Sequence, residues 1–217
     1  ITMVIYPIKM TPCTKAAPWG GSKLSREFYK KTEFEFTGES WEASAHRNGK
    51  SVAANGEYAG CDLAELTEKF GTELLGSRVK GSEFPVLFKL IDARDKLSVQ
   101  VHPDDEYARR EENDNGKTEM WTVIGCEEGA GLYLGFKEPI TKEEYAALIR
   151  SAQKVLHGNT KEAENLLRHF CEDTGAALPA GRLLPLGQTL CMVPEELPSL
   201  DGLKVLRVGL ELGQVLK

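Results

Sequence analysis

Alternating apolar and polar positions are common in the N-terminal part of the chain and predict short β-strands. Residues 34–45 alternate in this way on both sides of Gly38, which predicts two short, half-buried strands. Apolar runs predict further strands over residues 86–91, 97–101, 120–124 and 132–136. Because polar turns separate these closely spaced strands, the pattern favours an antiparallel sandwich or barrel over a parallel α/β sheet.

Capping signals predict a few helices among the strands. Asp62 and Glu65 form a capping box before an apolar run that ends at Gly71, so a short helix is expected there. A second box, formed by Thr141 and Glu144, begins a helix that continues through Ile149, and Thr160 caps another that runs to about residue 170. Acidic residues and arginines over 104–112 are typical of a solvated helix with internal ion pairs. We therefore expect a mainly β fold with a small helical insertion.

The texture of the sequence divides the chain into regions. We expect an N-terminal β-domain over residues 1–137, a helical insertion over 138–170, and a divergent or truncated return to the β-domain over 171–217. In the last region glycine and proline recur every few residues, with a strand-like segment at 203–210.

Composition and charge exclude several classes of function. The chain of 217 residues has 27 Lys and Arg against 33 Asp and Glu, a net charge of −6, whereas a nucleic-acid partner requires a basic surface. The 5 cysteines are widely spaced and form no C-x-x-C pair, which argues against a disulfide framework or a zinc finger. No apolar run approaches the roughly 18 residues of a membrane helix, and the N-terminal run lacks a secretory leader. We expect a cytoplasmic protein without membrane or nucleic-acid partners.

The predicted strand at 97–101 carries the most informative polar residues. Side chains alternate along a strand, so Ser98, Gln100 and the following His102 share one face, about 7 Å apart from one to the next. Imidazole suits zinc, and an amide oxygen is a serviceable second ligand, so Gln100 and His102 together could hold a divalent metal. The alternative is a hydrogen-bonded strand pair without a metal.

Two charged residues at the start of the next predicted strand extend this site. Glu119 could complete a ligand set of nitrogen and oxygen atoms, or it could be a solvated glutamate at a strand edge. Lys117 precedes it on the same face of the strand. A cation at that place could bind a sugar phosphate or an enediolate, or it could be an ordinary surface lysine.

Several segments, taken in order and spacing, resemble the type I mannose-6-phosphate isomerase family of the cupin superfamily. They are residues 17–21, 37–46, 84–93, 98–105 and 116–121. The resemblance implies a cupin-type antiparallel β-barrel or sandwich that interconverts mannose 6-phosphate and fructose 6-phosphate with one Zn²⁺ per chain. It assigns three metal ligands to Gln100, His102 and Glu119, and it places Ser98 and Lys117 in the substrate pocket, with Lys117 near the reacting sugar.

The C-terminal part departs from the family. The stretch that should carry a fourth ligand, a histidine, is residues 179–185 here, and Leu184 occupies the histidine position. The tail resembles the family segment with a catalytic arginine, which assigns that role to Arg207; the alternative is a surface arginine on a strand. Truncation, a shifted reading frame or divergence would each produce this pattern. Catalytic zinc sites often keep three protein ligands and a water, so a three-ligand site remains conceivable.

These departures leave alternative functions open. The main hypothesis is an active zinc-dependent aldose-ketose isomerase that acts on a small sugar phosphate. The second is an impaired or non-catalytic cupin that binds sugar phosphate, because of Leu184 and the altered tail. A metal-dependent oxygenase ranks last, since it would use more histidines than the chain offers at one site. We expect a monomer or a weak homo-oligomer, and a structural hydrogen bond at His46.

Overall fold

The structure is a computed structural model, and most of its described residues lie in or around β-sheets. It describes residues 5–97, 102–127, 130–131, 133–136, 141, 143–144, 146–147, 171–173, 183–186, 189–192 and 206–212. Among them the strands far outnumber the helices, as the sequence predicts. In this described part, no helix combines the length and the apolar character that crossing a membrane requires.

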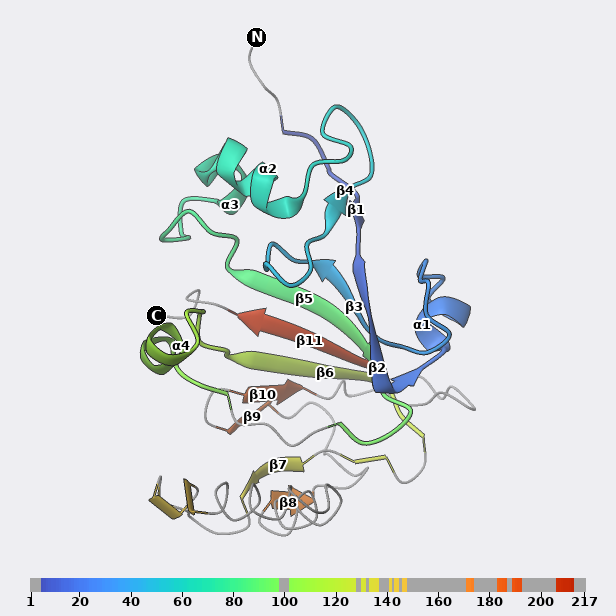
Figure 1. Cartoon of the computed structure of the whole chain (residues 1–217), viewed down its shortest axis with the longest axis vertical. Coiled ribbons are helices and arrows are strands. Elements are labelled where there is room, and N and C mark those ends of the chain that lie inside the picture. Colours follow the sequence, from blue (N-terminus) through green and yellow to red (C-terminus); the bar gives the residue numbers. More distant parts are fainter. Residues whose placement is uncertain are drawn as a thin grey trace.

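A seven-stranded sheet forms the body of the molecule (Figure 1). Its strands, in spatial order, are β2 (Cys13–Gly21), β3 (Thr37–Ala43), β5 (Val86–Asp92), β11 (Leu206–Leu212), β6 (Glu119–Gly125), β10 (Thr189–Met192) and β9 (Leu183–Leu186). All neighbours pair antiparallel except β6 and β10, which are parallel, so the sheet is mixed and the predicted antiparallel pairing is wrong for this one pair. A parallel pair needs a long crossover, and the chain between these two strands supplies one. Since β2 and β9 lie at opposite edges, the described strands form an open sheet and no closed barrel.

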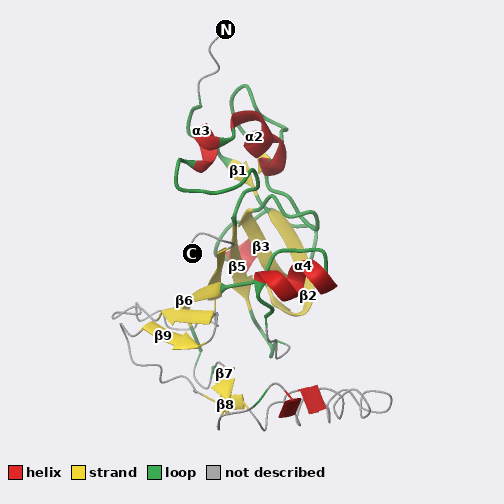
Figure 2. Ribbon diagram, turned by 90° about the vertical axis from the view of Figure 1, so that its left-hand side faces the viewer, coloured by secondary structure: helices red, strands yellow, loops and turns green. Residues whose placement is uncertain are grey.

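The described part also contains two small sheets, the helices α1 to α4, and helical residues at 143–144 and 146–147 (Figure 2). The sheets pair β1 (Met10–Thr11) with β4 (Val52–Ala53), and β7 (Tyr133–Phe136) with β8 (Cys171–Asp173). The helices are α1 (Lys23–Arg26), α2 (Leu63–Phe70), α3 (Thr72–Leu75) and α4 (Asp105–Glu111). The predicted solvated helix is confirmed as α4, whose Arg110 Nε lies 2.7 Å from Glu111 Oε1.

The N-terminal segment and α2 share an apolar core. Tyr58, Leu66 and Phe70 are almost fully buried, with Tyr58 stacked on Tyr6 at 5.5 Å and edge-on to Phe70 at 5.0 Å between ring centroids. Burial of this apolar surface is the main contribution that holds α2 against β1 and β4. The predicted capping box begins the helix: Glu65 N–H donates to Asp62 at 2.9 Å, and Asp62 N–H donates to Glu65 at 2.8 Å.

The predicted strands are confirmed at β5, β6 and β7, with one correction near the start. Within residues 34–45 the structure has the single strand β3 (Thr37–Ala43) rather than two strands. Phe34 and Phe36 lie before it and are 41% and 39% exposed. The Arg94 guanidinium covers the Phe36 ring at 4.1 Å from its centroid, so this aromatic packs under a cation instead of in a sheet. The predicted box of Thr141 and Glu144 is present, with Thr141 N–H donating to Glu144 at 2.8 Å. Most of the strand predicted over 97–101 lies outside the described residues.

The C-terminal strands join the same sheet as the N-terminal ones. β11 lies between β5 and β6 and pairs with both. A strand from the last region of the chain is thus inserted between two strands of the first region. The expected division at 1–137, 138–170 and 171–217 stays a prediction, and β9, β10 and β11 agree with a return of the last region to the sheet.

Candidate active site

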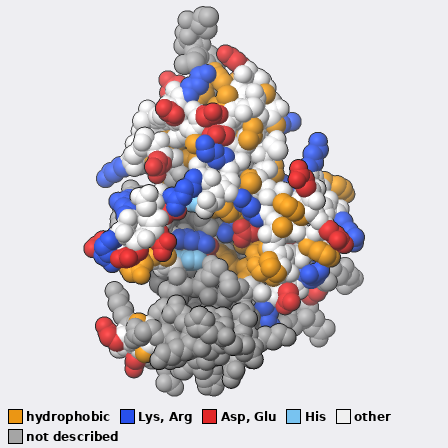
Figure 3. All heavy atoms as spheres, viewed as in Figure 1, with side chains coloured by type: hydrophobic (Ala, Val, Ile, Leu, Met, Phe, Trp, Pro, Cys, Tyr) orange, Lys and Arg blue, Asp and Glu red, His pale blue; other side chains and the backbone are white. Residues whose placement is uncertain are grey.

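Charged side chains gather on one face of the central strands. Paired residues share a face of a sheet, and so do alternate residues along a strand. Trp41 lies opposite Lys89, which lies opposite Gly209, which in turn lies opposite Trp121, so these positions form one row across β3, β5, β11 and β6. Glu119, two residues before Trp121, lies on that same face. Figure 3 shows charged side chains and a histidine close together near the centre of the molecule.

Glu119 is the central group of the site. Its residue is only 4% exposed, and its carboxylate has three close partners. Oε2 lies 2.8 Å from His102 Nε2 and accepts a hydrogen bond from Trp121 Nε1 at 3.1 Å. Oε1 lies 3.0 Å from Lys117 Nζ. Burial without such partners would be costly, so the alternative of a solvated glutamate at a strand edge does not apply.

The partners keep this buried carboxyl group ionised. Burial alone would raise the pKa of Glu119, because a carboxylate is less stable away from water. The hydrogen bond from His102 and the charge of Lys117 more than reverse that effect, and the pKa falls to about 2. Glu119 is therefore a carboxylate at neutral pH, and both His102 and Lys117 contact this negative charge.

Backbone contacts bring His102 and Lys117 to the same carboxylate. His102 lies just before α4, and Asp104 caps that helix by accepting the Tyr107 N–H at 2.8 Å. After α4 the chain returns to the residues that precede this helix, where Lys117 N–H donates to the carbonyl of Pro103 at 3.0 Å. The two ends of the α4 segment are thus fixed together at the beginning of β6, which places imidazole and ammonium on either side of Glu119.

A second cluster on the same face was not foreseen from the sequence. Lys89 is 6% exposed, and its Nζ lies 3.5 Å from Glu39 Oε1, while Trp41 Nε1 donates to Glu39 Oε2 at 2.6 Å. The arrangement repeats that of Glu119, whose tryptophan also follows two residues later and donates to it. The repeated Glu-x-Trp pattern at 39–41 and 119–121 was the available signal, but only the register of β3 with β5 adds the lysine.

The structure brings together some of the predicted site residues. His102, Lys117 and Glu119 are in contact, whereas Ser98 and Gln100 lie outside the described residues. His102 Nε2 and Glu119 Oε2 face each other, and imidazole and carboxylate are both zinc ligands. No group of three or more His, Cys, Asp or Glu suited to a metal occurs among the residues described. A metal at this place would need a further ligand, and Gln100 stays the predicted one.

The structure places Leu184 and Arg207, the two residues singled out in the C-terminal region, in the strands β9 and β11. Leu184 lies in β9 opposite Cys191, and leucine has no atom that binds zinc. Arg207 lies in β11 opposite Ile91 and Val123, whereas Glu119 lies opposite Glu211. At roughly 3.3 Å per residue, Arg207 and Glu211 are about 13 Å apart along the strand. By the same register Arg207 lies on the face that carries Lys89 and Glu119, and its catalytic role stays a prediction.

Comparison with protein families divides the chain. The family described as phosphomannose isomerase type I, catalytic domain, matches residues 8–132. Residues 169–217 match a different family, described as the first C-terminal domain of the RsmF rRNA methyltransferase. The isomerase family match therefore ends before the segment that contains Arg207, whose catalytic role stays a prediction.

Relatives and solved structures support the N-terminal match. The mannose-6-phosphate isomerase of Streptococcus mutans is 49% identical over 131 residues, which are 60% of this chain and 40% of the relative. Mannose-6-phosphate isomerase ManA of Bacillus subtilis is 41% identical over 152 residues, 70% of this chain and 47% of the relative. The solved mannose 6-phosphate isomerase of Bacillus subtilis matches with a TM-score of 0.68 and 31% identity, over 96% of this chain and 59% of that chain.

These matches cover most of this chain but only part of each related protein. The chain spans less than half the length of the curated relatives named above. A structure from Archaeoglobus fulgidus, a putative mannosephosphate isomerase, shares the fold with a TM-score of 0.62 at 22% identity. The isomerase family nevertheless matches more than half of the residues here, including His102, Lys117 and Glu119. The chain therefore belongs to the type I phosphomannose isomerase family.

Proposed function

We propose that this chain carries the isomerase site that interconverts mannose 6-phosphate and fructose 6-phosphate. The observation that carries the proposal is the buried carboxylate of Glu119, held ionised between His102 and Lys117. The names of the relatives, mannose-6-phosphate isomerases, give the substrate. The partner we propose is thus a small sugar phosphate.

We also propose one Zn²⁺ per chain, held by His102 and Glu119 with Gln100 as the predicted third ligand. Support comes from the donor set, an imidazole nitrogen and a carboxylate oxygen that face each other at 2.8 Å in a largely buried place. A bound zinc ion supplies a Lewis acid that withdraws charge from sugar oxygens. The low pKa of Glu119 favours metal binding, because only the ionised carboxylate is a ligand.

The chain's own cations have a role in this chemistry. Isomerisation moves a proton from C2 to C1 of the open-chain sugar through a cis-enediol, whose oxygens carry developing negative charge. The Lys117 ammonium, close to Glu119, is placed to stabilise that charge. Lys89, buried on the same face beside Glu39, is a second cation that can orient an anionic substrate group.

The remaining part of the proposal concerns the barrel, the cellular location and the partners of the chain. We propose that the open sheet is one wall of a cupin-type barrel, in which the charged face of Glu119 and Lys89 turns inward. A cytoplasmic location, a monomer or weak homo-oligomer, and the absence of membrane and nucleic-acid partners stay predictions. The net charge of −6 is the support for the last of them.

The alternative is an impaired site that binds sugar phosphate without turnover. It is favoured by Leu184 at the position of the fourth ligand and by the match of residues 169–217 to a different family. A coupled assay with mannose 6-phosphate, with zinc and after chelation, separates the two functions. Zinc-dependent turnover that His102→Ala abolishes supports the isomerase. Thermal stabilisation by mannose 6-phosphate without turnover supports the impaired protein, and turnover unaffected by chelation contradicts the zinc site.

A further inference from the structure

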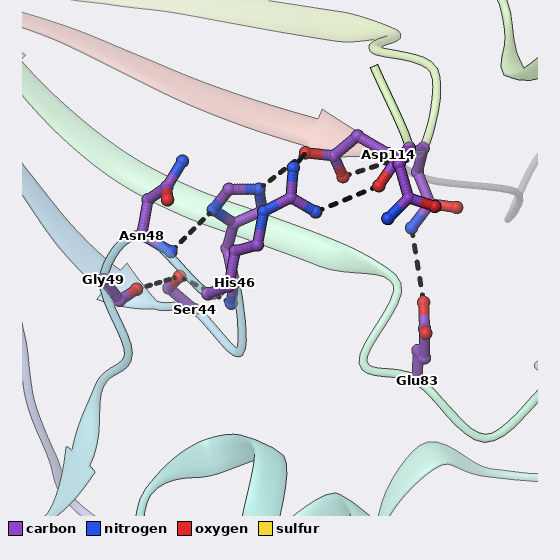
Figure 4. A network of polar contacts seen from close by, with 9 residues as sticks. Ser44, His46, Asn48, Gly49, Glu83 and Asp114 are labelled. Atoms are coloured by element: carbon purple, nitrogen blue, oxygen red, sulfur yellow. Dashed lines mark hydrogen bonds and ion pairs between the residues drawn. The ribbon is translucent and has the colours of Figure 1, made fainter. Parts of the chain in front are cut away.

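Lys117 belongs to a loop that is held from outside by the turn after β3. The loop runs from the end of α4 to the start of β6, over residues 112–118. His46 Nε2 lies 3.2 Å from Asp114 Oδ2, and Arg47 Nη2 lies 2.8 Å from the same oxygen. Arg47 Nη1 also donates to the carbonyl of Asn113 at 3.1 Å. Figure 4 shows the His46 ring between Asn48 on one side and Asp114 on the other.

The surroundings of His46 fix which ring nitrogen donates. Asn48 N–H donates to His46 Nδ1 at 3.2 Å, so Nδ1 is the acceptor and the ring proton is on Nε2. That N–H points at Asp114 Oδ2. Trp41 lies edge-on to the ring, with the two ring centroids 6.0 Å apart. The imidazole thus bridges its own turn and a loop that is far away in the sequence, with one nitrogen serving each.

The carboxylate that receives these contacts is suited to act as an anchor. Partial burial would raise the pKa of Asp114, but the hydrogen bonds from the His46 ring and from the Asn115 N–H lower it overall. The same side chain accepts the Asn115 N–H at 2.9 Å through its other oxygen. Asp114 therefore transmits the contacts of His46 and Arg47 directly to the backbone that leads to Lys117.

The opposite side of the loop is fixed by α4. Gly116 N–H donates to Asp105 Oδ1 at 3.0 Å. A Cβ on Gly116 would lie 2.4 Å from the Asp105 backbone nitrogen, so the loop packs tightly against the start of α4. Asp114 N–H donates to the carbonyl of Ala108 in α4 at 3.3 Å, so α4 and the turn after β3 hold the outer part of the loop, residues 113–115, from two sides. The contact of Asn115 Nδ2 with Glu83 Oε2, at 3.3 Å, is exposed and weaker.

We propose that His46, together with Arg47, is a positioning residue for the active site: through Asp114 it holds the 112–118 loop so that the Lys117 ammonium reaches Glu119. The consequence for turnover rests on the proposed isomerase function, whereas the consequence for the loop does not. His46 touches neither substrate nor metal in this account, and its effect is transmitted through the backbone between Asp114 and Lys117.

A matched pair of substitutions separates the two nitrogens of His46. His46→Asn keeps an oxygen near the Nδ1 position for the Asn48 N–H but does not reach Asp114. His46→Gln places an amide N–H near the Nε2 position and so keeps the bond to Asp114. Hydrogen–deuterium exchange of the full chain measures the amides of 113–117. We expect exchange about fivefold faster or more in His46→Asn, as for one lost side-chain hydrogen bond, and near wild type in His46→Gln.

The exchange measurement tests the role of His46 in the loop, and the turnover measurement tests its consequence for the isomerase reaction. Equal exchange in wild type and His46→Asn, or a larger increase in His46→Gln than in His46→Asn, would overturn the proposal. In the coupled assay we expect His46→Asn to lower kcat with little change in KM, and His46→Gln to restore it, because Lys117 stabilises charge that develops only during reaction. If the wild-type chain shows no turnover, the proposed function fails, but the exchange comparison still decides the role of His46.

Discussion

Replacing Glu119 by glutamine removes the charge that organises the site while keeping its shape. The carboxyl pKa of Glu119 is about 2 in the folded chain against an ordinary 4.5. At about 1.4 kcal/mol per pKa unit, this difference corresponds to about 3 kcal/mol of stability at neutral pH. The group is almost fully buried, so solvent screens this contribution little.

The sign of the pH dependence follows from the lowered pKa. A carboxyl group with a lower pKa in the folded chain stabilises it above the ordinary value of 4.5, and this contribution is lost as the pH falls towards about 2. Of the total, about 2 kcal/mol is lost between pH 7 and pH 3. Glu119→Gln has no such titration, so its deficit in unfolding free energy relative to wild type is expected to shrink by about that amount over the same interval.

Urea denaturation at pH 7 and pH 3 measures this directly. A double-mutant cycle with Lys117→Met isolates the pair, and we expect a coupling of about 1–3 kcal/mol at pH 7 that is smaller at pH 3. A deficit for Glu119→Gln that is the same at both pH values would refute the reasoning. So would strict additivity of the two substitutions at pH 7.

Two other expectations test the tail and the helix start. Lys117→Ala should lower kcat in the coupled assay about 100-fold, as removal of a group that stabilises developing charge does. Arg207 lies four residues along β11 from Glu211, the partner of Glu119, so Arg207→Ala should lower kcat less. An equal loss would support the catalytic role predicted for Arg207. Asp62→Ala removes the capping box of α2 and should lower the free energy of unfolding, measured by urea denaturation, by about 1 kcal/mol. Lys50→Met is the control for the ion pair of Lys50 with Asp62 at 2.7 Å. An unchanged free energy of unfolding in Asp62→Ala would show that the cap does not contribute.

Local sequence patterns predicted the parts of the fold that depend on neighbouring residues. The apolar runs of β5 and β6 and the capping box at Asp62 are local, and the structure confirms them. The spacing of Lys117 and Glu119 also predicted that they share one face, and the two side chains are 3.0 Å apart. In each case the signal and the structure involve residues a few positions apart.

Other features depend on which strands pair, and no local pattern specifies that. The parallel pairing of β6 with β10 joins strands separated by a long connection. Lys89 reaches Glu39 only because β3 and β5 are in that register. His46 was expected to make a structural hydrogen bond, and it makes one, but its partner Asp114 is 68 residues away. The pattern at 34–45 predicted one strand too many, because Phe36 packs against Arg94.

Zinc titration of the metal-free chain tests the central claim, that His102 and Glu119 form one half of a metal-dependent isomerase site. Calorimetry should give one Zn²⁺ per wild-type chain, with binding lost or greatly weakened in both His102→Ala and Glu119→Gln, and retained in Glu39→Gln, which alters the neighbouring cluster instead. Binding of zinc with the same stoichiometry and affinity in His102→Ala and in wild type would contradict the account.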